Sequence, residues 1–207
     1  MPSKLENLKR TLTWADFNPK QANPPGPGQF AVAAFTDSAY NAFSWSLAAV
    51  PNSKPTAYVL ADNITITIVF KPSSWVASWV SGRSAQEKKD LLNHEQGHYN
   101  ITALMARDLF VDLMLLKSTQ FTDQQKAKTE IETITKRYST SVIQKIHDKY
   151  DSDSETKHGF NKPAQQRWDN YINQAFTTAR TPASSSPDGI AHKVTLLDVL
   201  KTAGKGP

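Results

Sequence analysis

Residues 84–116 read SAQEKKDLLNHEQGHYNITALMARDLFVDLMLL, and we expect them to form the helix on which the rest of the domain packs. The stretch opens with SAQE at positions 84–87, which has the form of a capping box, so we predict that a helix begins there. The helix can continue through Leu91 and Leu92 to Leu116. One turn in its middle reads HEQGH at positions 94–98, and that turn indicates the chemistry of the chain.

The two histidines of this turn have the spacing of metal ligands. On a helix, His94 and His98 lie one turn apart on the same face and can direct two imidazoles at one Zn²⁺. Glu95 projects from the adjacent face, where a general base for a zinc-activated water belongs. The alternative is a structural pair of histidines. We favour the metal interpretation because the chain has only five histidines, so this spacing would rarely arise by chance.

Gly97, inside the same turn, predicts a close contact with the helix backbone. A glycine costs about 1 kcal/mol in a helix interior relative to alanine, and it is tolerated when another segment must pack against the backbone. The alternative, that Gly97 is simply neutral, stays open at this point.

The composition limits both the size and the partners of the protein. A chain of 207 residues with 39% hydrophobic content can form one domain with a core. The net charge is +5, but the basic residues are scattered, and in residues 122–150 they alternate with acidic ones as on a solvated helical face. We therefore expect no nucleic-acid partner. No run approaches the ~18 apolar residues of a membrane span, and the N-terminus has no apolar signal-peptide region as written.

The absence of cysteine bears directly on the metal site. Disulfides and thiolate ligands are excluded, so any zinc must be held by histidine, carboxylate and water.

Strands precede helices along the chain. Residues 12–17, 30–35, 43–50, 57–60 and 64–70 have the character of strands, the last with period-2 alternation, and Asp62-Asn63 predicts a hairpin between the final two. A second capping box at 122–125 opens a helix whose apolar stripe continues to Ile146, and a third helix starts near Pro163. The order predicts an α+β fold, with a mostly antiparallel twisted sheet packed on the zinc helix.

We divide the chain accordingly into an N-terminal extension (1–9), one domain (10–180) and a Ser/Pro/Gly-rich linker or mobile tail (181–207).

A catalytic zinc site needs a third protein ligand. We interpret His147 as a cation at a helix C-terminus, and His192 lies in the predicted tail. Glu130 and Glu132 flank the apolar stripe and are expected to face solvent. His158 remains, in a loop where Gly159 gives the backbone freedom to direct the imidazole at the first helix. The residues alone also leave a structural role for this loop histidine open.

Two motifs in this order resemble a known family. HEQGHYNI at 94–101, preceded by Ser74-Trp75, and Tyr150-Asp151…Thr156-x-His158-Gly159…Gln166-x-Trp168 are similar to motifs of a bacterial family described as secreted Zn-dependent proteases (domain of unknown function 922). The LTWADF stretch at 12–17 resembles the family's opening element, and the resemblance covers roughly residues 10–178. Tyr99 and Asn100 stand where the family usually has Phe and Asp, and two extra residues lengthen the segment from Asp151 to Thr156.

The resemblance implies a zincin-like zinc metallopeptidase acting on a protein or peptide. Its Zn²⁺ ligands would be His94, His98 and His158, with the remaining position held by a water whose pKa falls to around 7. Glu95 would take the proton from this water and later deliver it to the leaving amine. Tyr150 is the candidate to stabilise the oxyanion, although a helix-end aromatic packed on the core is an equal alternative.

Residues 64–70 could bind substrate by strand addition. The family resemblance implies a secreted or periplasmic protein, although this sequence contains no signal peptide, and a monomer is favoured. Two alternatives remain: a zinc-containing binding module without activity, and a zinc hydrolase acting on another amide or ester.

Overall fold

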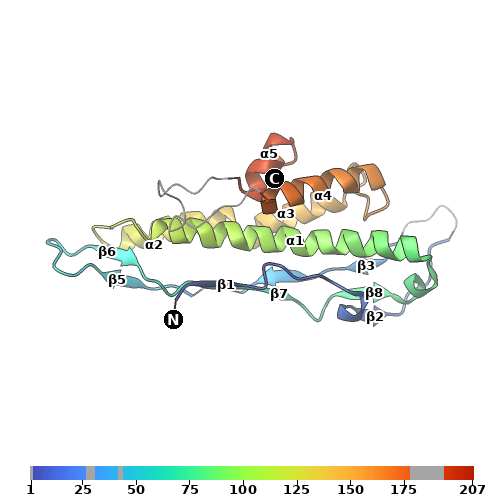
Figure 1. Cartoon of the computed structure of the whole chain (residues 1–207), viewed down its shortest axis with the longest axis horizontal. Coiled ribbons are helices and arrows are strands. Elements are labelled where there is room, and N and C mark those ends of the chain that lie inside the picture. Colours follow the sequence, from blue (N-terminus) through green and yellow to red (C-terminus); the bar gives the residue numbers. More distant parts are fainter. Residues whose placement is uncertain (1, 27–30, 42–43, 178–193) are drawn as a thin grey trace.

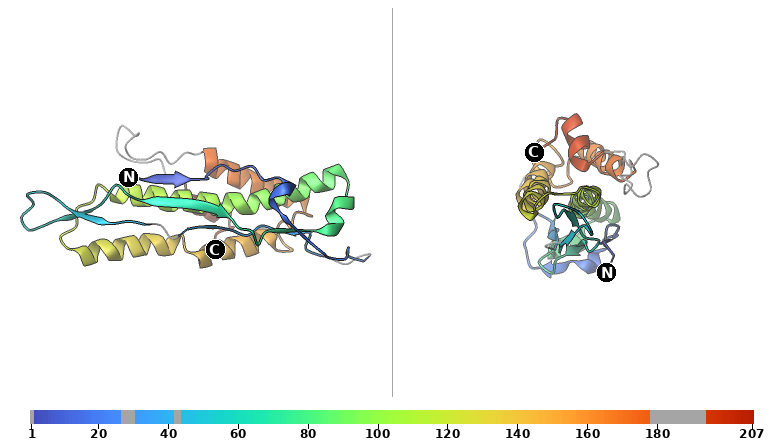
Figure 2. Two further views of the ribbon diagram at one scale, coloured as in Figure 1. Left: turned by 90° about the horizontal axis from the view of Figure 1, so that it is seen from below. Right: turned by 90° about the vertical axis from the view of Figure 1, so that its left-hand side faces the viewer.

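The computed structural model of the chain describes residues 2–26, 31–41, 44–177 and 194–207. Its central element is α1 (Ala85–Leu116), which lies between a layer of short strands and a layer of helices (Figure 1). The Ser84 hydroxyl accepts a hydrogen bond from the backbone of Glu87, whose carboxylate accepts from the backbone of Ser84, so the predicted capping box is confirmed. Because α1 is covered on two sides, it can bury polar side chains as well as apolar ones (Figure 2).

Within the described residues, eight short strands form the layer on one side of α1. They are β1 (Lys4–Glu6), β2 (Asn18–Lys20), β3 (Ala34–Phe35), β4 (Ser38–Tyr40), β5 (Leu47–Ala49), β6 (Tyr58–Leu60), β7 (Thr65–Phe70) and β8 (Trp75–Ala77). They make three small sheets, in the orders β1-β7-β4, β2-β8-β3 and β5-β6. Each three-stranded sheet combines one parallel and one antiparallel pairing, so the fold is α+β, but its sheets are small and mixed rather than one mostly antiparallel sheet.

The predicted alternation in β7 is confirmed, whereas the predicted hairpin is wrong. Ile64, Ile66 and Ile68 are fully buried beneath α1, as the period of two requires. However, β6 pairs with β5, and β7 pairs with β1 and β4. β1 lies beside β7 along 65–67 and β4 lies on the other side along 68–70, so among the described residues neither edge of β7 is open along its full length, which does not favour strand addition at residues 64–70.

Residues 12–17 contain a 3₁₀ turn (Trp14–Asp16) instead of a strand. The Asp16 carboxylate accepts hydrogen bonds from the backbone and the hydroxyl of Thr13, at 2.7 and 2.9 Å. Local bonds of this kind compete with strand pairing, and the apolar pattern alone does not report them.

In the part of the chain that the structure describes, four helices cover the other side of α1: α2 (Gln124–Arg137), α3 (Thr140–Asp151), α4 (Lys162–Thr177) and α5 (Leu196–Thr202). The predicted second helix is divided in two at Tyr138 and Ser139. The backbone carbonyl of Tyr138 accepts a hydrogen bond from the Tyr40 hydroxyl, and its own hydroxyl donates to Asp112 at 2.6 Å. The apolar stripe continues across this break, which is why the sequence did not reveal it.

Both ends of the chain contribute to the packed body. β1, within the predicted N-terminal extension, pairs with β7, and α5, within the predicted tail, buries Leu196 and Leu200. The backbone N–H of Leu196 donates to the buried carboxylate of Asp108 on α1 at 2.9 Å. Residues 178–193, which include the Pro/Ser-rich start of the predicted tail, lie outside the described residues.

Among the described residues, no helix combines the length and the apolar character needed to cross a bilayer.

Candidate metal centre

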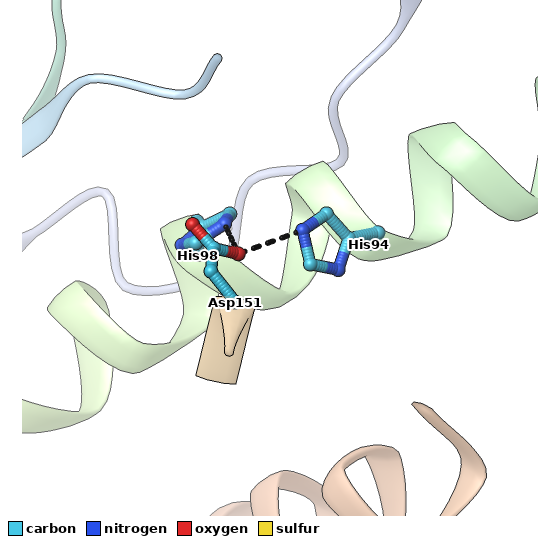
Figure 3. Close-up of side chains that lie close together, drawn as sticks. All are labelled: His94, His98 and Asp151. Atoms are coloured by element: carbon cyan, nitrogen blue, oxygen red, sulfur yellow. Dashed lines mark ion pairs between the residues drawn. The ribbon is translucent and has the colours of Figure 1, made fainter. Parts of the chain in front are cut away.

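The middle of α1 carries the histidine pair that the sequence singles out. His94 and His98 are 1% and 7% exposed, and their ring centroids are 4.9 Å apart. Both direct Nε2 toward one oxygen, Oδ1 of Asp151, which lies 3.0 Å from His94 and 2.9 Å from His98 (Figure 3). The three donor atoms lie within 4.8 Å of one another, as atoms that hold a single metal ion must. We call these three residues the metal triad.

Asp151 is the member of the triad that sequence reasoning missed. It is the last residue of α3, and the end of that helix brings its carboxylate over the 94–98 turn (Figure 3). A signal was present, because Asp151 belongs to the second family-like motif. The motif also contains His158, and spacing alone does not show which of the two side chains reaches the first helix.

The triad fits a zinc ion in donor type and in spacing. Two donors bound at about 2.0–2.1 Å to a tetrahedral Zn²⁺ lie roughly 3.3 Å apart, close to the two nitrogen–oxygen distances in the triad. Oδ1 of Asp151 is buried, and among the described residues it has no hydrogen-bond partner despite its two close imidazoles. A buried carboxylate oxygen close to two nitrogens but bonded to neither is the arrangement expected where a cation belongs.

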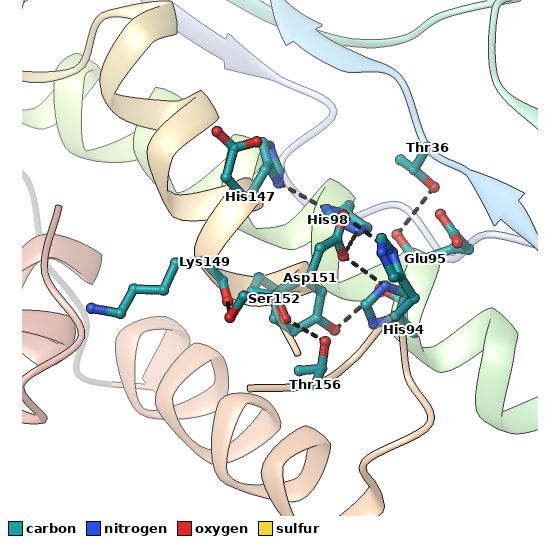
Figure 4. Close-up of polar contacts among 12 residues, drawn as sticks. Thr36, His94, Glu95, His98, His147, Lys149, Asp151, Ser152 and Thr156 are labelled. Atoms are coloured by element: carbon teal, nitrogen blue, oxygen red, sulfur yellow. Dashed lines mark hydrogen bonds and ion pairs between the residues drawn. The ribbon is translucent and has the colours of Figure 1, made fainter. Parts of the chain in front are cut away.

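Nδ1 of each histidine of the pair contacts another side chain, which leaves its Nε2 for a metal. Nδ1 of His94 lies 3.0 Å from the side-chain oxygen of Gln165, so this nitrogen carries the proton. Nδ1 of His98 lies 2.9 Å from Nδ1 of His147 (Figure 4). Partners of this kind fix the tautomer and the ring orientation of histidine ligands.

His147 is therefore not the solvated helix-end cation that the sequence suggested. Burial and the neighbouring His98 lower its pKa to about 3, so the imidazole is neutral. Its Nε2 lies 3.2 Å from the hydroxyl of Thr102, which accepts a hydrogen bond from Ser38 on β4. The prediction of a solvated cation at His147 is wrong because its polar partners, His98 and Thr102, lie on α1. The apolar stripe of α3 shows only that Ile146 faces inward and gives no information on those partners.

The electrostatics of the triad favour a bound cation. Burial alone would raise the pKa of Asp151, but His94 and His98 outweigh burial and hold that pKa well below its usual range. Burial would lower the pKa of His98, yet the carboxylates of Asp151 and Glu95 raise it. The carboxylates thus make the site attractive to positive charge, as a metal site should be.

Glu95 is buried beside the triad, and its side chain is 3% exposed. One of its carboxylate oxygens, Oε2, is buried and has no hydrogen-bond partner among the described residues. The Thr36 hydroxyl, beside β3, donates to the backbone carbonyl of Glu95 at 3.3 Å, which holds this turn of α1 against the strand layer (Figure 4). A buried carboxylate oxygen without a partner is costly and therefore indicates a functional role.

His158, the predicted third ligand, lies at the edge of the triad. Its Nδ1 is 3.6 Å from Oδ2 of Asp151, and its ring centroid is 6.3 Å from that of His94. The backbone of residues 157–159 is left-handed, with φ values of 50°, 50° and 82°. A Cβ on Gly159 would lie 2.9 Å from Cβ of His94, so the glycine allows this loop to press against the cluster. The structure brings His158 near the metal triad without making it a member, and direct ligation by His158 stays a prediction.

Tyr150 packs between the ring of His94 and the α1 backbone at Gly97. Its ring stacks on that of His94 with centroids 4.6 Å apart, and its hydroxyl donates to the carbonyl of His94 at 3.2 Å. The same hydroxyl accepts from Gln165 at 2.6 Å. The geometry therefore matches the packing alternative, and stabilisation of an oxyanion by Tyr150 stays a prediction that these contacts do not favour.

The predicted close approach to Gly97 is confirmed, and Tyr150 is the residue that requires it. A Cβ at position 97 would lie 2.1 Å from the tyrosine hydroxyl and 2.7 Å from its Cζ.

Comparisons with models of known families, with curated proteins and with solved structures find no match to this chain. The family resemblance therefore rests on the motifs themselves.

Proposed function

We propose that this protein is a zinc-dependent peptidase whose metal ion is held by His94, His98 and Asp151. The observation that carries the proposal is the coincidence of two features in one helical turn. Two buried imidazoles and one carboxylate oxygen of Asp151 converge with their donor atoms within 4.8 Å of one another. Beside them, Oε2 of the buried Glu95 has no hydrogen-bond partner among the described residues. A purely structural zinc site has no need of such a second carboxylate.

Each residue has a defined task in this proposal. His94 and His98 offer the lone pairs of Nε2, while Gln165 and His147 hold the rings from behind. Asp151 supplies the negative charge. A bound Zn²⁺ would supply the Lewis acid that makes water nucleophilic near neutral pH and polarises the scissile carbonyl. Glu95 accepts the proton of the attacking water and returns it to the leaving amine.

The neighbouring strand β3 supports a peptide as the substrate. It is an edge strand, because among the described residues it pairs only with β8. It also lies next to the catalytic turn, to which Thr36 connects it. An extended peptide can add to such an edge through its backbone, which would place a scissile bond above α1. In this proposal β3 replaces residues 64–70 as the substrate strand.

The decisive experiment is Glu95→Gln, which removes the general base and keeps the size of the side chain. We expect hydrolysis of unfolded protein or mixed peptides to fall by at least about 100-fold, while the protein still binds one Zn²⁺. Glu132→Gln, at an exposed position of α2, is the matched control and should change neither property. Full activity in the Glu95 variant would contradict the proposal, as would a wild-type protein that binds zinc and hydrolyses nothing.

A further inference from the structure

A groove with a positive lining begins beside the metal triad. Two cavities, of about 550 and 230 Å³, share Trp79, Arg83 and Phe160 in their walls and so form one continuous groove. We call it the Trp79 groove. It runs between the 3₁₀ helix at Ser78–Gly82, the first turns of α1 and the loop before α4.

The groove lies next to the site, although none of the three triad residues is part of its lining. Gly159 lines its smaller cavity, and a Cβ on this residue would lie 2.9 Å from Cβ of His94. Leu91, one helical turn before Glu95, lines the same cavity. A substrate bound across the triad could therefore place a neighbouring side chain, or its own chain end, in the groove.

The larger cavity offers hydrogen-bond donors and positive charge. Arg83 and Lys157 line it, together with the amide of Asn161, and none of the described residues in its wall is acidic. Nε1 of Trp79 is a buried donor with no hydrogen-bond partner among the described residues. Trp79 and Phe160 add two aromatic rings, and Phe160 is 53% exposed.

The acidic residues that line the smaller cavity do not cancel the positive charge of the groove. Asp90 is paired with Lys162 at 2.6 Å. Arg83 lies 3.3 Å from Glu87, but both side chains are substantially exposed, and an exposed pair of this kind is weak. A guanidinium has five N–H donors in a planar fork, so Arg83 can also bind a second carboxylate. Its position over the Trp79 ring, 5.1 Å from the centroid, keeps the guanidinium at the groove.

We propose that the Trp79 groove binds a carboxylate of the substrate, so that cleavage is favoured beside an acidic residue or beside a free C-terminus. The inference rests on the proposed peptidase function. Arg83 and Lys157 would repel a basic side chain, and an apolar one would gain nothing from either cation. The aromatic rings suit the methylene groups that precede a side-chain carboxylate.

The test uses the full chain loaded with zinc and a set of quenched fluorescent peptides. The peptides differ only by Glu, Gln or Lys at each position around the cleaved bond, and one pair differs only by a free or amidated C-terminus. We expect kcat/KM for one Glu peptide, or for the free-ended peptide, to exceed that of its neutral partner by at least about 10-fold, the size of one charge-assisted contact. The first result identifies a side-chain carboxylate as the ligand, and the second identifies the chain end.

Variants of the groove assign the preference to its residues. Arg83→Met should reduce the preference to less than about twofold, and Arg83→Glu should shift it toward the Lys peptide. Lys89→Met, at an exposed position that does not line the groove, should keep the wild-type preference. Equal kcat/KM for the Glu, Gln and free-ended peptides would overturn the inference, as would an unchanged preference in Arg83→Met.

A binding measurement separates failure of this inference from failure of the proposed function. Calorimetry with the Glu95→Gln variant needs no hydrolysis, and it should show the same order of peptide affinities. Carboxylate-dependent binding without hydrolysis by the wild type would contradict the peptidase and support the groove. Hydrolysis without any carboxylate preference would support the peptidase and contradict the role of the groove.

Discussion

The two halves of the metal triad are built in different ways. His94 and His98 lie on one continuous helix, where the spacing of four residues alone puts them on one face. Asp151 is followed by a loop with left-handed residues at 157–159, and it reaches the triad only because α3, this loop and α4 are packed around it. The helical half is fixed by local geometry, whereas the Asp151 half depends on contacts with distant parts of the chain.

The buried carboxylate of Glu155 is the centre of those distant contacts. It accepts a hydrogen bond from Nε1 of Trp168 on α4 at 3.1 Å and pairs with Lys205, fifty positions further along the chain. The backbone carbonyl of Glu155 also accepts from Asn161 at 2.9 Å. The segment after α5 thus stabilises the loop that joins Asp151 to His158.

The largest effect should follow from removing a ligand of the helical half. His98→Ala should lower Zn²⁺ affinity by more than about 100-fold, because removal of even the residues behind metal ligands commonly costs 10–100-fold. His158→Ala should lower it by less than about 10-fold if Asp151 is the third ligand. Zinc titration against a competing chelator measures both. The reverse order would make His158 the ligand and contradict the triad.

The next effect concerns the contact on which both halves depend. Gly97→Ala places a methyl group where the Tyr150 hydroxyl lies, so the ring or the helix must move. Overpacking of this kind typically costs 1–3 kcal/mol, so we expect Gly97→Ala to lower the free energy of unfolding by about 2 kcal/mol. Urea denaturation measures this change. Gly82→Ala is the matched control, because a Cβ there meets no atom within 4 Å. A Gly97 variant as stable as the control would show that Tyr150 does not need this space.

A smaller effect should distinguish the Asp151 half from the helical half. Lys205→Met and Glu155→Gln each remove one charge of the ion pair between these two residues. Each should weaken zinc binding by about 10-fold, because the loop that follows Asp151 loses a contact while the metal ligands are unchanged. Lys201→Met, exposed on α5, should leave the affinity unchanged. Circular dichroism should show an intact fold in all three. Wild-type affinity in both pair variants would mean that the loop holds Asp151 without help from the C-terminal segment.

The smallest effect tests the contacts behind His98. Thr102→Val keeps the shape of the side chain and removes the hydroxyl that Nε2 of His147 contacts. We expect zinc affinity to fall about threefold, since this group lies one contact further from the metal than the residues that typically cost 10-fold or more. The same substitution at the exposed Thr133 provides the control. A loss above 100-fold in Thr102→Val would mean that the hydroxyl acts on the metal site directly.

The sequence predicted the local half of the structure well, for a physical reason. The capping box at 84–87, the length of α1 and the placement of His94, Glu95 and His98 follow from helical periodicity. The close contact at Gly97 follows because glycine is unfavourable in a helix interior and is tolerated there when another segment packs against the backbone. None of these features needs knowledge of another element, so a single stretch of chain specifies them.

The other half could not be predicted, because it depends on which elements meet. Asp151 reaches the triad only through the packing of α3 against α1, and His147 is neutral because it is buried and lies against His98. The docking of α5 depends on the buried carboxylate of Asp108, which lies 88 positions before the N–H that it receives. Spacing along the chain carries no information on such pairs without an alignment of relatives.

Crystals of the full chain grown with Zn²⁺, measured on both sides of the zinc absorption edge, would show which residues hold the metal ion. We expect a single strong anomalous peak about 2.0–2.2 Å from Nε2 of His94, Nε2 of His98 and a carboxylate oxygen of Asp151. A peak bound by His158 with Asp151 turned away, or no peak between the two helical imidazoles, would contradict the triad.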